Sequence, residues 1–124
     1  MRKLYHLAVD ATLDVIRGKW KLSILCHLGN GDLRTGELRR KMPGISQKVL
    51  TEQLRELEAA NVVIRKVYNE VPPRVEYSLS PRGKSLRRIL LAMSDWGRCL
   101  VKEQQEAGKD VEILNQNDEG FRDS

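Results

Sequence analysis

Cysteine is scarce in this chain of 124 residues, which contains only Cys26 and Cys99. The two thiols are far apart in the sequence, which excludes a secreted disulfide framework, a zinc ribbon and a CxxC redox centre. Cys26 lies in an apolar stretch, where a thiol usually acts as a small core residue. Cys99 follows Gly97 and Arg98 on an expected C-terminal helix, and it is the better of these two candidates for a redox or electrophile sensor.

Long apolar runs are also missing. The longest unbroken one, at residues 89–93, is far shorter than the roughly 18 residues that a membrane span requires. Asp10 and Asp14 interrupt the start of the chain, so we expect no signal peptide. The sequence therefore predicts a cytosolic protein with no membrane partner.

Residue patterns typical of catalysis are absent as well. The chain has no Gly-rich phosphate loop, no nucleophile elbow, no HExxH pair and no kinase-type set. His27 follows Cys26 directly, but neighbours on a helix point about 100° apart, which is poor geometry for one metal ion. We therefore expect no enzyme, no metal site and no cofactor.

Charge is plentiful and unevenly distributed. The chain carries 22 lysines and arginines against 17 aspartates and glutamates, a net charge of +5. Residues 1–106 hold 20 basic and 12 acidic side chains, or +8, whereas residues 107–124 hold 2 and 5, or −3. A basic body is typical of a protein that binds a polyanion, either nucleic acid or a phospholipid surface. Residues 107–124 are predicted to form an acidic, mobile tail.

Helical periodicity is strongest in the first half of the chain, where it predicts helices at residues 10–16, 20–28, 37–42 and 47–59. Pro43 ends the third, since the residue before proline avoids helical geometry. Gly44 is free to take a positive φ in the turn that follows, and Ser46 is a good N-cap for the fourth helix. Ile45 and Leu50 match a hydrophobic staple, which fixes the angle at which the chain enters this helix.

The helix at residues 47–59 has two distinct faces. One arc holds Val49, Leu50, Gln53, Leu54 and Leu57, and the opposite arc is polar and rich in hydrogen-bond donors. Two helices that meet at a short Gly-containing turn, the second with a polar outer face, are typical of a helix-turn-helix unit.

After residue 61 the apolar period changes from 3.6 to 2, which predicts strands at residues 63–68 and 75–79. Pro72 and Pro73 stiffen the loop between them and are predicted to hold Arg74 near its tip. Ser80 and Pro81 then begin a long amphipathic helix that runs past residue 100. The predicted fold is mainly α with a small β-hairpin wing (α+β), a winged helix-turn-helix whose terminal helices form a dimer interface. The domain is predicted at residues 7–106.

Five stretches resemble one known family closely: LDVIRGKW (13–20), ELRR (37–40), PGISQKVLT (43–51), QLRELE (53–58) and YNEVPPRVEYSL (68–79). The chain is similar to the HxlR-type winged helix-turn-helix transcriptional regulators of bacteria over roughly residues 8–100. The resemblance implies a homodimer that binds a pseudo-palindromic operator in double-stranded DNA, with dimer contacts from the N- and C-terminal helices. It also implies an unidentified small-molecule effector as a further candidate partner.

The chain departs from the family at two places. Many members carry a Cys-Pro pair just before the first helix, where this chain has Leu7 and Ala8. A redox mechanism that relies on that cysteine is therefore not implied here. Many members also have an aromatic residue after the arginine that precedes the third helix, where this chain has Thr35 after Arg34.

In a helix-turn-helix the second helix lies in the major groove, and its N-terminal half reaches the base edges. Gln47, Lys48 and Thr51 are therefore the predicted base readers, and Arg74 on the wing is the candidate for the minor groove. Helix-terminal donors and basic side chains would hold phosphates. The full predicted DNA-binding set is Arg34, Arg39, Arg40, Lys41, Ser46, Gln47, Lys48, Thr51, Arg55, Lys66 and Arg74.

Dimer contacts are expected from one apolar stripe of the last helix and from the first helix, with Trp96 as an anchor. Basic residues elsewhere on the last helix, namely Arg87, Arg88 and Lys102, are more simply interpreted as solvated charges. The predicted interface residues are Leu13, Leu86, Ile89, Leu90, Met93, Trp96 and Leu100.

Two other functions stay open as alternatives. The first is a winged-helix module that docks another protein without sequence-specific DNA binding, although a protein interface tends to be poor in lysine. The second is an enzyme, which would need a concave site with perturbed titratable groups, and the sequence nominates none.

Overall fold

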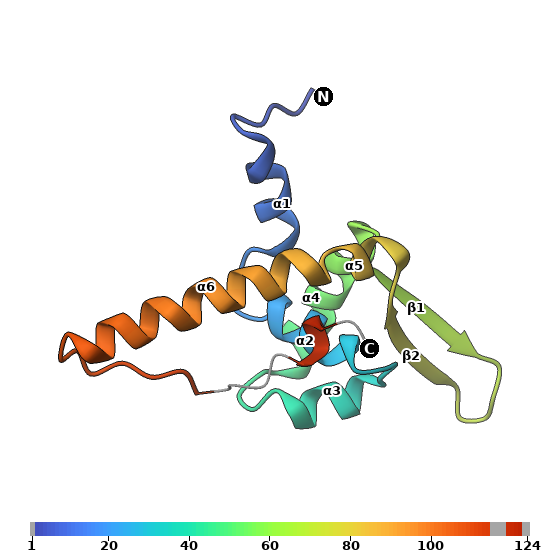
Figure 1. Cartoon of the computed structure of the whole chain (residues 1–124). Helices are drawn as coiled ribbons and strands as arrows, with labels where there is room; N and C mark the ends of the chain where they lie inside the picture. The colour runs from blue at the N-terminus through green and yellow to red at the C-terminus, as the bar shows by residue number, and fades with distance from the viewer. Residues whose placement is uncertain (1, 115–118, 123–124) are drawn as a thin grey trace.

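The computed structural model describes residues 2–114 and 119–122. Figure 1 shows a helical body with a β-hairpin on one side. Helix α1 and the far half of α6 extend away from this body. This architecture confirms the predicted winged helix-turn-helix fold. The elements, in chain order, are α1 (Ala8–Ile16), α2 (Lys21–Gly29), α3 (Thr35–Lys41), α4 (Gln47–Ala59), β1 (Val63–Tyr68), β2 (Arg74–Leu79), α5 (Pro81–Ser85), α6 (Arg87–Glu106) and the 3-10 helix η1 (Glu119–Phe121).

The turn between α3 and α4 forms as its residues predict. Gly44 takes a positive φ of 93°, and the Val49 N–H donates to the Ser46 side-chain oxygen over 3.1 Å. Helix α3 begins two residues earlier than predicted, at Thr35, because the Glu37 carboxylate accepts the Arg34 N–H over 2.9 Å and supports the helix start.

The wing is an antiparallel hairpin in which Val63 lies opposite Leu79 and Tyr68 lies opposite Arg74. A third short segment joins it, which the sequence did not predict. Leu33 and Tyr77 exchange two backbone hydrogen bonds of 3.0 and 2.8 Å, and they form an isolated bridge. The segment between α2 and α3 is therefore tied directly to the wing.

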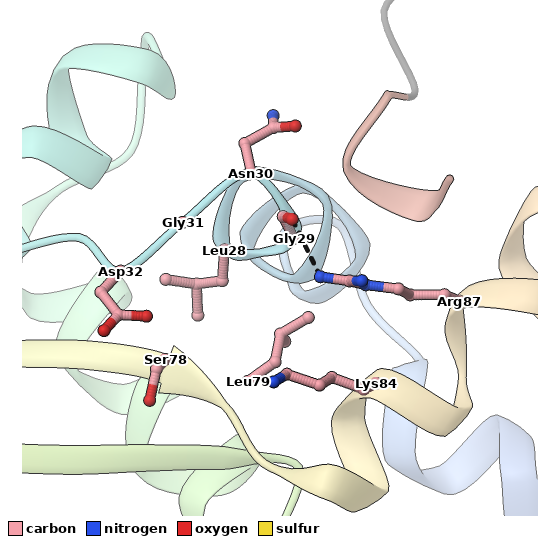
Figure 2. Close-up of a pocket in the computed structure, with 9 residues that line it drawn as sticks. All are labelled: Leu28, Gly29, Asn30, Gly31, Asp32, Ser78, Leu79, Lys84 and Arg87. Carbon is pink, nitrogen blue, oxygen red and sulfur yellow. Dashed lines mark hydrogen bonds between the residues drawn. The ribbon is translucent and has the colours of Figure 1, made fainter. Parts of the chain in front are cut away.

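The long last helix of the prediction is two helices. The Leu86 N–H bonds to the Gly83 carbonyl in the tighter three-residue pattern, and this residue separates α5 from α6. Figure 2 shows how α6 is then attached at its start: an Arg87 terminal nitrogen donates to the Gly29 carbonyl at the end of α2 over 2.9 Å. A side chain predicted to be solvated thus joins two helices that are distant in the sequence.

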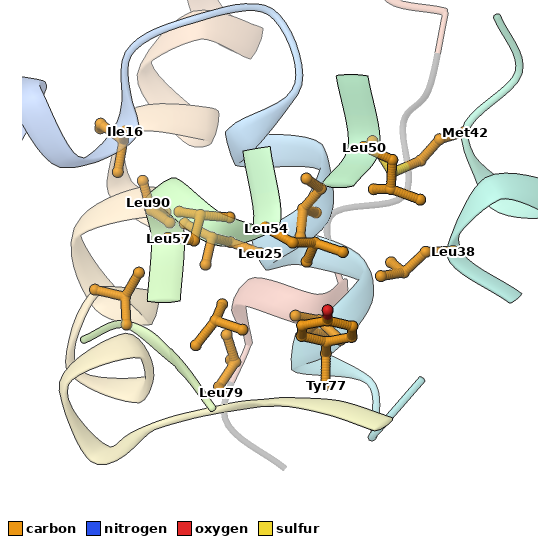
Figure 3. Packing of buried hydrophobic residues seen from close by; sticks show 14 of the residues in the cluster. Ile16, Leu25, Leu38, Met42, Leu50, Leu54, Leu57, Tyr77, Leu79 and Leu90 are labelled. Carbon is orange, nitrogen blue, oxygen red and sulfur yellow. The ribbon is translucent and has the colours of Figure 1, made fainter. Parts of the chain in front are cut away.

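The hydrophobic core lies between α2, α4 and the base of the wing (Figure 3). Leu50, Leu54 and Leu57, from the apolar face of α4, are completely or almost completely buried. Leu90 is also in this core, with only 3% of its surface exposed. Its predicted place in a dimer interface is therefore wrong, because the chain's own core already covers it.

Within residues 107–124, which were predicted to form a mobile tail, one short segment packs against the body. Phe121 is buried in the core, and η1 contacts both α2 and α6. The apolar surface of this one ring gives the segment a reason to dock that its acidic composition does not suggest. Residues 115–118 and 123–124, which the tail prediction also includes, lie outside the described residues.

Replacement of Leu54 by alanine should destabilise the fold strongly. Leu54 is 1% exposed, so the change leaves a cavity and costs about 2–5 kcal/mol in the free energy of unfolding. Leu114→Ala is the matched control, since Leu114 is 92% exposed. Urea unfolding at one protein concentration measures both. Equal midpoints for the two variants would contradict this assignment of the core.

Candidate nucleic-acid interface

The outer face of α4 presents the residues that the sequence nominated as base readers. Gln47, Lys48 and Arg55 are exposed, and Thr51 is half-buried beside them. The Gln47 side-chain amide donates to the Thr51 hydroxyl over 3.3 Å, so these two side chains are held together one turn apart. Since Leu50 and its apolar neighbours face the core, this polar face points outward.

The start of α4 is built to accept a negative charge. Ser46 uses its side-chain oxygen to cap the helix, and the remaining N–H groups of the first turn carry the positive end of the helix dipole. Gln47 and Lys48 follow immediately and are exposed. The arrangement suits a phosphate or a base-edge acceptor at this end of the helix.

Helix α3 places three basic side chains next to this helix start. Arg39, Arg40 and Lys41 form its last turn and are all exposed, and Arg34 is exposed at its N-cap. A hollow of about 390 Å³ lies between α3 and α4 and is lined by Arg39, Arg40 and Gln47 among others. Arg39 and Arg40, two of the predicted phosphate contacts, thus lie beside Gln47, one of the predicted base readers.

The wing holds Arg74 differently from the prediction. Arg74 is the first residue of β2 and not the tip of the loop, and its guanidinium lies 3.8 Å from the centre of the Tyr68 ring. Glu70 and Glu76 approach it to 3.5 and 4.0 Å. The predicted placement of Arg74 at the tip is therefore wrong, because the pairing of Tyr68 with Arg74 ends the hairpin ladder there.

Lys66, the other basic residue predicted on the wing, is exposed on β1, with its ammonium 5.0 Å from the Tyr68 ring centre. The apolar tip residue Val71 is fully exposed. The wing thus presents two exposed cations on β1, Arg65 and Lys66, together with the Arg74 guanidinium near two carboxylates and an apolar tip.

An ion pair between the buried Lys21 and the exposed Glu56 was not predicted from the sequence. Lys21 is only 8% exposed, and its ammonium lies 3.3 Å from the Glu56 carboxylate, which also accepts the Gln53 amide over 3.1 Å. The pair joins the first turn of α2 to α4. The feature of the sequence that could have indicated this pair is Lys21, the only lysine in the mostly apolar helix α2.

The candidate dimer residues divide into two groups. Leu13, Ile89, Met93, Trp96 and Leu100 are exposed, and Trp96 is the most exposed of them at 70%. Ile89, Met93, Trp96 and Leu100 follow each other at helical spacing, so they form one apolar stripe along α6. Leu86 is half-buried against the core, and Leu90 is inside it.

The thiols and the nearby histidine are not gathered into one site. Cys26 is half-buried on α2 and Cys99 is exposed on α6, and neither is in a disulfide. Burial lowers the pKa of His27, and the charge of Lys41 lowers it further. His27 is thus neutral near pH 7 and adds no charge behind α3.

Within residues 2–114 and 119–122, histidine, cysteine and carboxylate side chains nowhere form a group of three or more suited to a metal ion. No helix in this part of the chain is long and apolar enough to cross a membrane.

The chain is similar to known transcriptional regulators both in sequence and in fold. The chain is 59% identical over 96 residues to the HTH-type transcriptional regulator YtcD of Bacillus subtilis. The matched stretch covers 77% of this chain and 76% of YtcD. Its fold is similar to that of the redox regulator HypR in its reduced form, with a TM-score of 0.76, 47% identity and coverage of 81% of this chain and 99% of HypR. A MarR-family transcriptional regulator from Enterococcus faecalis V583 gives a TM-score of 0.75 at 40% identity, over 86% of this chain and 96% of that protein.

These similarities, with the fold, define a winged helix-turn-helix transcriptional regulator. The sequence matches the family described as HxlR-like helix-turn-helix over residues 15–105, within the predicted domain. The chain belongs to this HxlR-like family, as its sequence motifs predicted.

Removal of the Ser46 hydroxyl should weaken the start of the recognition helix. Ser46→Ala loses the cap on the Val49 N–H and should lower the free energy of unfolding by about 1 kcal/mol, as is usual for an N-cap. Ser46→Thr keeps the hydroxyl and should retain most of the stability. Thermal unfolding of the three proteins at one concentration tests this, and a Thr variant as unstable as the Ala variant would argue against the cap.

Proposed function

We propose that this regulator acts as a homodimer on a pseudo-palindromic operator, with α4 in the major groove and the wing at the minor groove. The observation that carries the proposal is the hollow between α3 and α4, where the basic side chains Arg39 and Arg40 lie beside Gln47 at the start of the polar side of α4. Gln47 can pair with adenine, Lys48 can donate to guanine O6 and N7, and the Thr51 methyl can contact thymine. Arg55, one turn further along, is suited to a phosphate or to a more distant base.

The phosphate contacts are proposed to come from the basic residues around α3. Arg34, Arg39, Arg40 and Lys41 are exposed, and no carboxylate within the described residues forms an ion pair with any of them in the structure. Cations free of carboxylate partners can neutralise phosphates without first breaking an ion pair. They supply affinity and orientation, whereas the α4 residues supply sequence preference.

On the wing, Lys66 is more available to DNA than Arg74. To enter a minor groove, Arg74 would have to break its ion pairs with Glu70 and Glu76, and Lys66 has no such cost. We therefore assign the wing's backbone contact to Lys66 and a secondary role to Arg74.

Dimerisation is proposed through the apolar stripe of α6, defined by Ile89, Met93, Trp96 and Leu100, together with the exposed apolar side of α1. Helix α6 buries only Leu90 completely although it is 20 residues long. Figure 1 shows α1 and the far half of α6 standing clear of the body, where a second copy can cover both. Exposed apolar surface of this extent marks an interaction site in a protein that is otherwise well packed.

A winged-helix module that binds only protein is the alternative. It is disfavoured by the unpaired cations around α3, since protein interfaces are depleted in lysine and favour apolar surface at their centre. Selection of genomic fragments on the purified chain, followed by titration at several salt concentrations, separates the two. An enriched inverted repeat with half-sites about 34 Å apart, or a multiple of that, supports the operator. Absence of binding at low salt supports the module.

Lys48 and Arg40 should respond differently to alanine substitution. Lys48→Ala should cost about 1–3 kcal/mol on the selected operator and relax preference at one base position, because it removes a base contact. Arg40→Ala should weaken binding to all sequences alike and lower the salt slope by about one unit. Fluorescence anisotropy on operator and random DNA measures both effects. Equal loss of Lys48→Ala on the two DNAs would refute its role as a base reader.

Trp96→Ala should shift the protein toward the monomer. Trp96 is 70% exposed within one chain, so a role in its own fold is small and its apolar surface is available to a second copy. Leu114→Ala, which removes an exposed apolar side chain outside the helices, is the control. Sedimentation equilibrium over a range of concentrations compares the two with the unmodified chain. An unchanged profile for Trp96→Ala would remove this residue from the interface.

A further inference from the structure

The chain reverses direction at the end of α6 and comes back toward the body. Gly108 takes a φ of +86°, and the Lys109 N–H donates to the Gln104 carbonyl over 2.9 Å, which closes the helix. The Gln105 side-chain amide then holds the returning segment by donating to the Val111 carbonyl over 2.9 Å. Figure 1 shows η1 next to α2, near the middle of the body and far from the end of α6.

The end of this returning segment is fitted closely to α2. A Cβ placed on Gly120 would fall well inside contact distance of the Cys26 carbonyl, and one placed on Gly29 would collide with the Gly120 carbonyl. Both positions therefore need glycine for the two backbones to approach. This backbone contact brings Phe121 into the core, where only 8% of it is exposed.

The docking site joins the two parts of the molecule whose relative position matters most for a dimer. Helix α2 belongs to the body that carries α3 and α4, and α6 carries the apolar stripe assigned to dimerisation. Segment η1 contacts both helices. Figure 2 shows it beside the end of α2, where Arg87 also joins α6 to Gly29. Phe121 and Arg87 thus act on the same joint.

We propose that Gly120 and Phe121 form an intramolecular strap that fixes the angle of α6 against the DNA-reading body, so that docked and undocked chains differ in operator affinity. The inference rests on the proposed dimeric operator binding. In a dimer, a small rotation of α6 moves the partner's recognition helix over a long lever arm, whereas the two half-sites stand at a set distance on the duplex. A docked strap fixes the spacing of the two recognition helices before DNA binds. When the strap is undocked, part of the binding free energy is lost to ordering α6.

The strap and the operator must then favour each other equally. Because coupling between two binding events is reciprocal, a docked strap that strengthens operator binding requires that bound operator strengthen docking. Hydrogen–deuterium exchange of α2 and of residues 119–122 should therefore slow when the selected operator is added to the full-length chain.

Phe121→Ala is the direct test, because it removes the docked ring and leaves the charge of the tail unchanged. We expect faster exchange in α2 and operator affinity weakened about 5-fold or more, as for a modest allosteric coupling. The salt slope should stay the same, since no cation is lost. Leu114→Ala, in the same segment but exposed, should leave both measurements unchanged.

A second variant guards against a general loss of structure. Gly120→Ala keeps Phe121 but places a methyl group against the Cys26 carbonyl, so it should undock the segment and reproduce both effects. Faster exchange with unchanged operator affinity in both variants would overturn the strap and leave Phe121 as simple packing. Unchanged exchange would overturn the docking itself. Failure of the unmodified chain to bind any selected operator would instead refute the proposed function, and with it the effect of the strap on DNA.

Discussion

Burial of the apolar side of α4 is the interaction on which the rest of the molecule depends. Leu50, Leu54 and Leu57 lie at helical spacing and enter the core between α2 and the wing. Once they are buried, the rotation of α4 about its own axis is settled, and the polar arc with Lys48 has to face outward. The capped start at Ser46 and the turn at Gly44 then determine where this face stands relative to α3.

The same core also organises elements that are distant from the recognition helix. The bridge between Leu33 and Tyr77 ties the start of α3 to the wing, and the Lys21–Glu56 pair ties α2 to α4. Arg87 and Phe121 add two attachments between α2 and α6. A change at one of these joints can therefore reach α3 and α4 through packed contacts and not through flexible loops.

Most local features were predictable because they depend on neighbours in the sequence. Ser46 caps the helix that it precedes, Gly44 permits its turn, and the alternation around Val63 produces a strand. Prediction failed where a residue's environment comes from elsewhere. Arg74 was placed at the loop tip, but the strand pairing and two nearby glutamates hold it at the base of the loop. Leu90 was assigned to a dimer because its stripe looked unpartnered, and the core of the same chain covers it.

The order of residues alone was sufficient for the family, the winged helix-turn-helix fold and the polar face of α4, since each follows from periodicity, caps and contiguous motifs. Tertiary structure alone decided which apolar side chains of α6 are exposed and which cations form ion pairs with carboxylates. It also placed Phe121 in the core, through an approach of Gly120 to α2 that no local pattern encodes. The physical reason is that burial and ion pairing are set by residues far apart in the chain, whose distances exist only after folding.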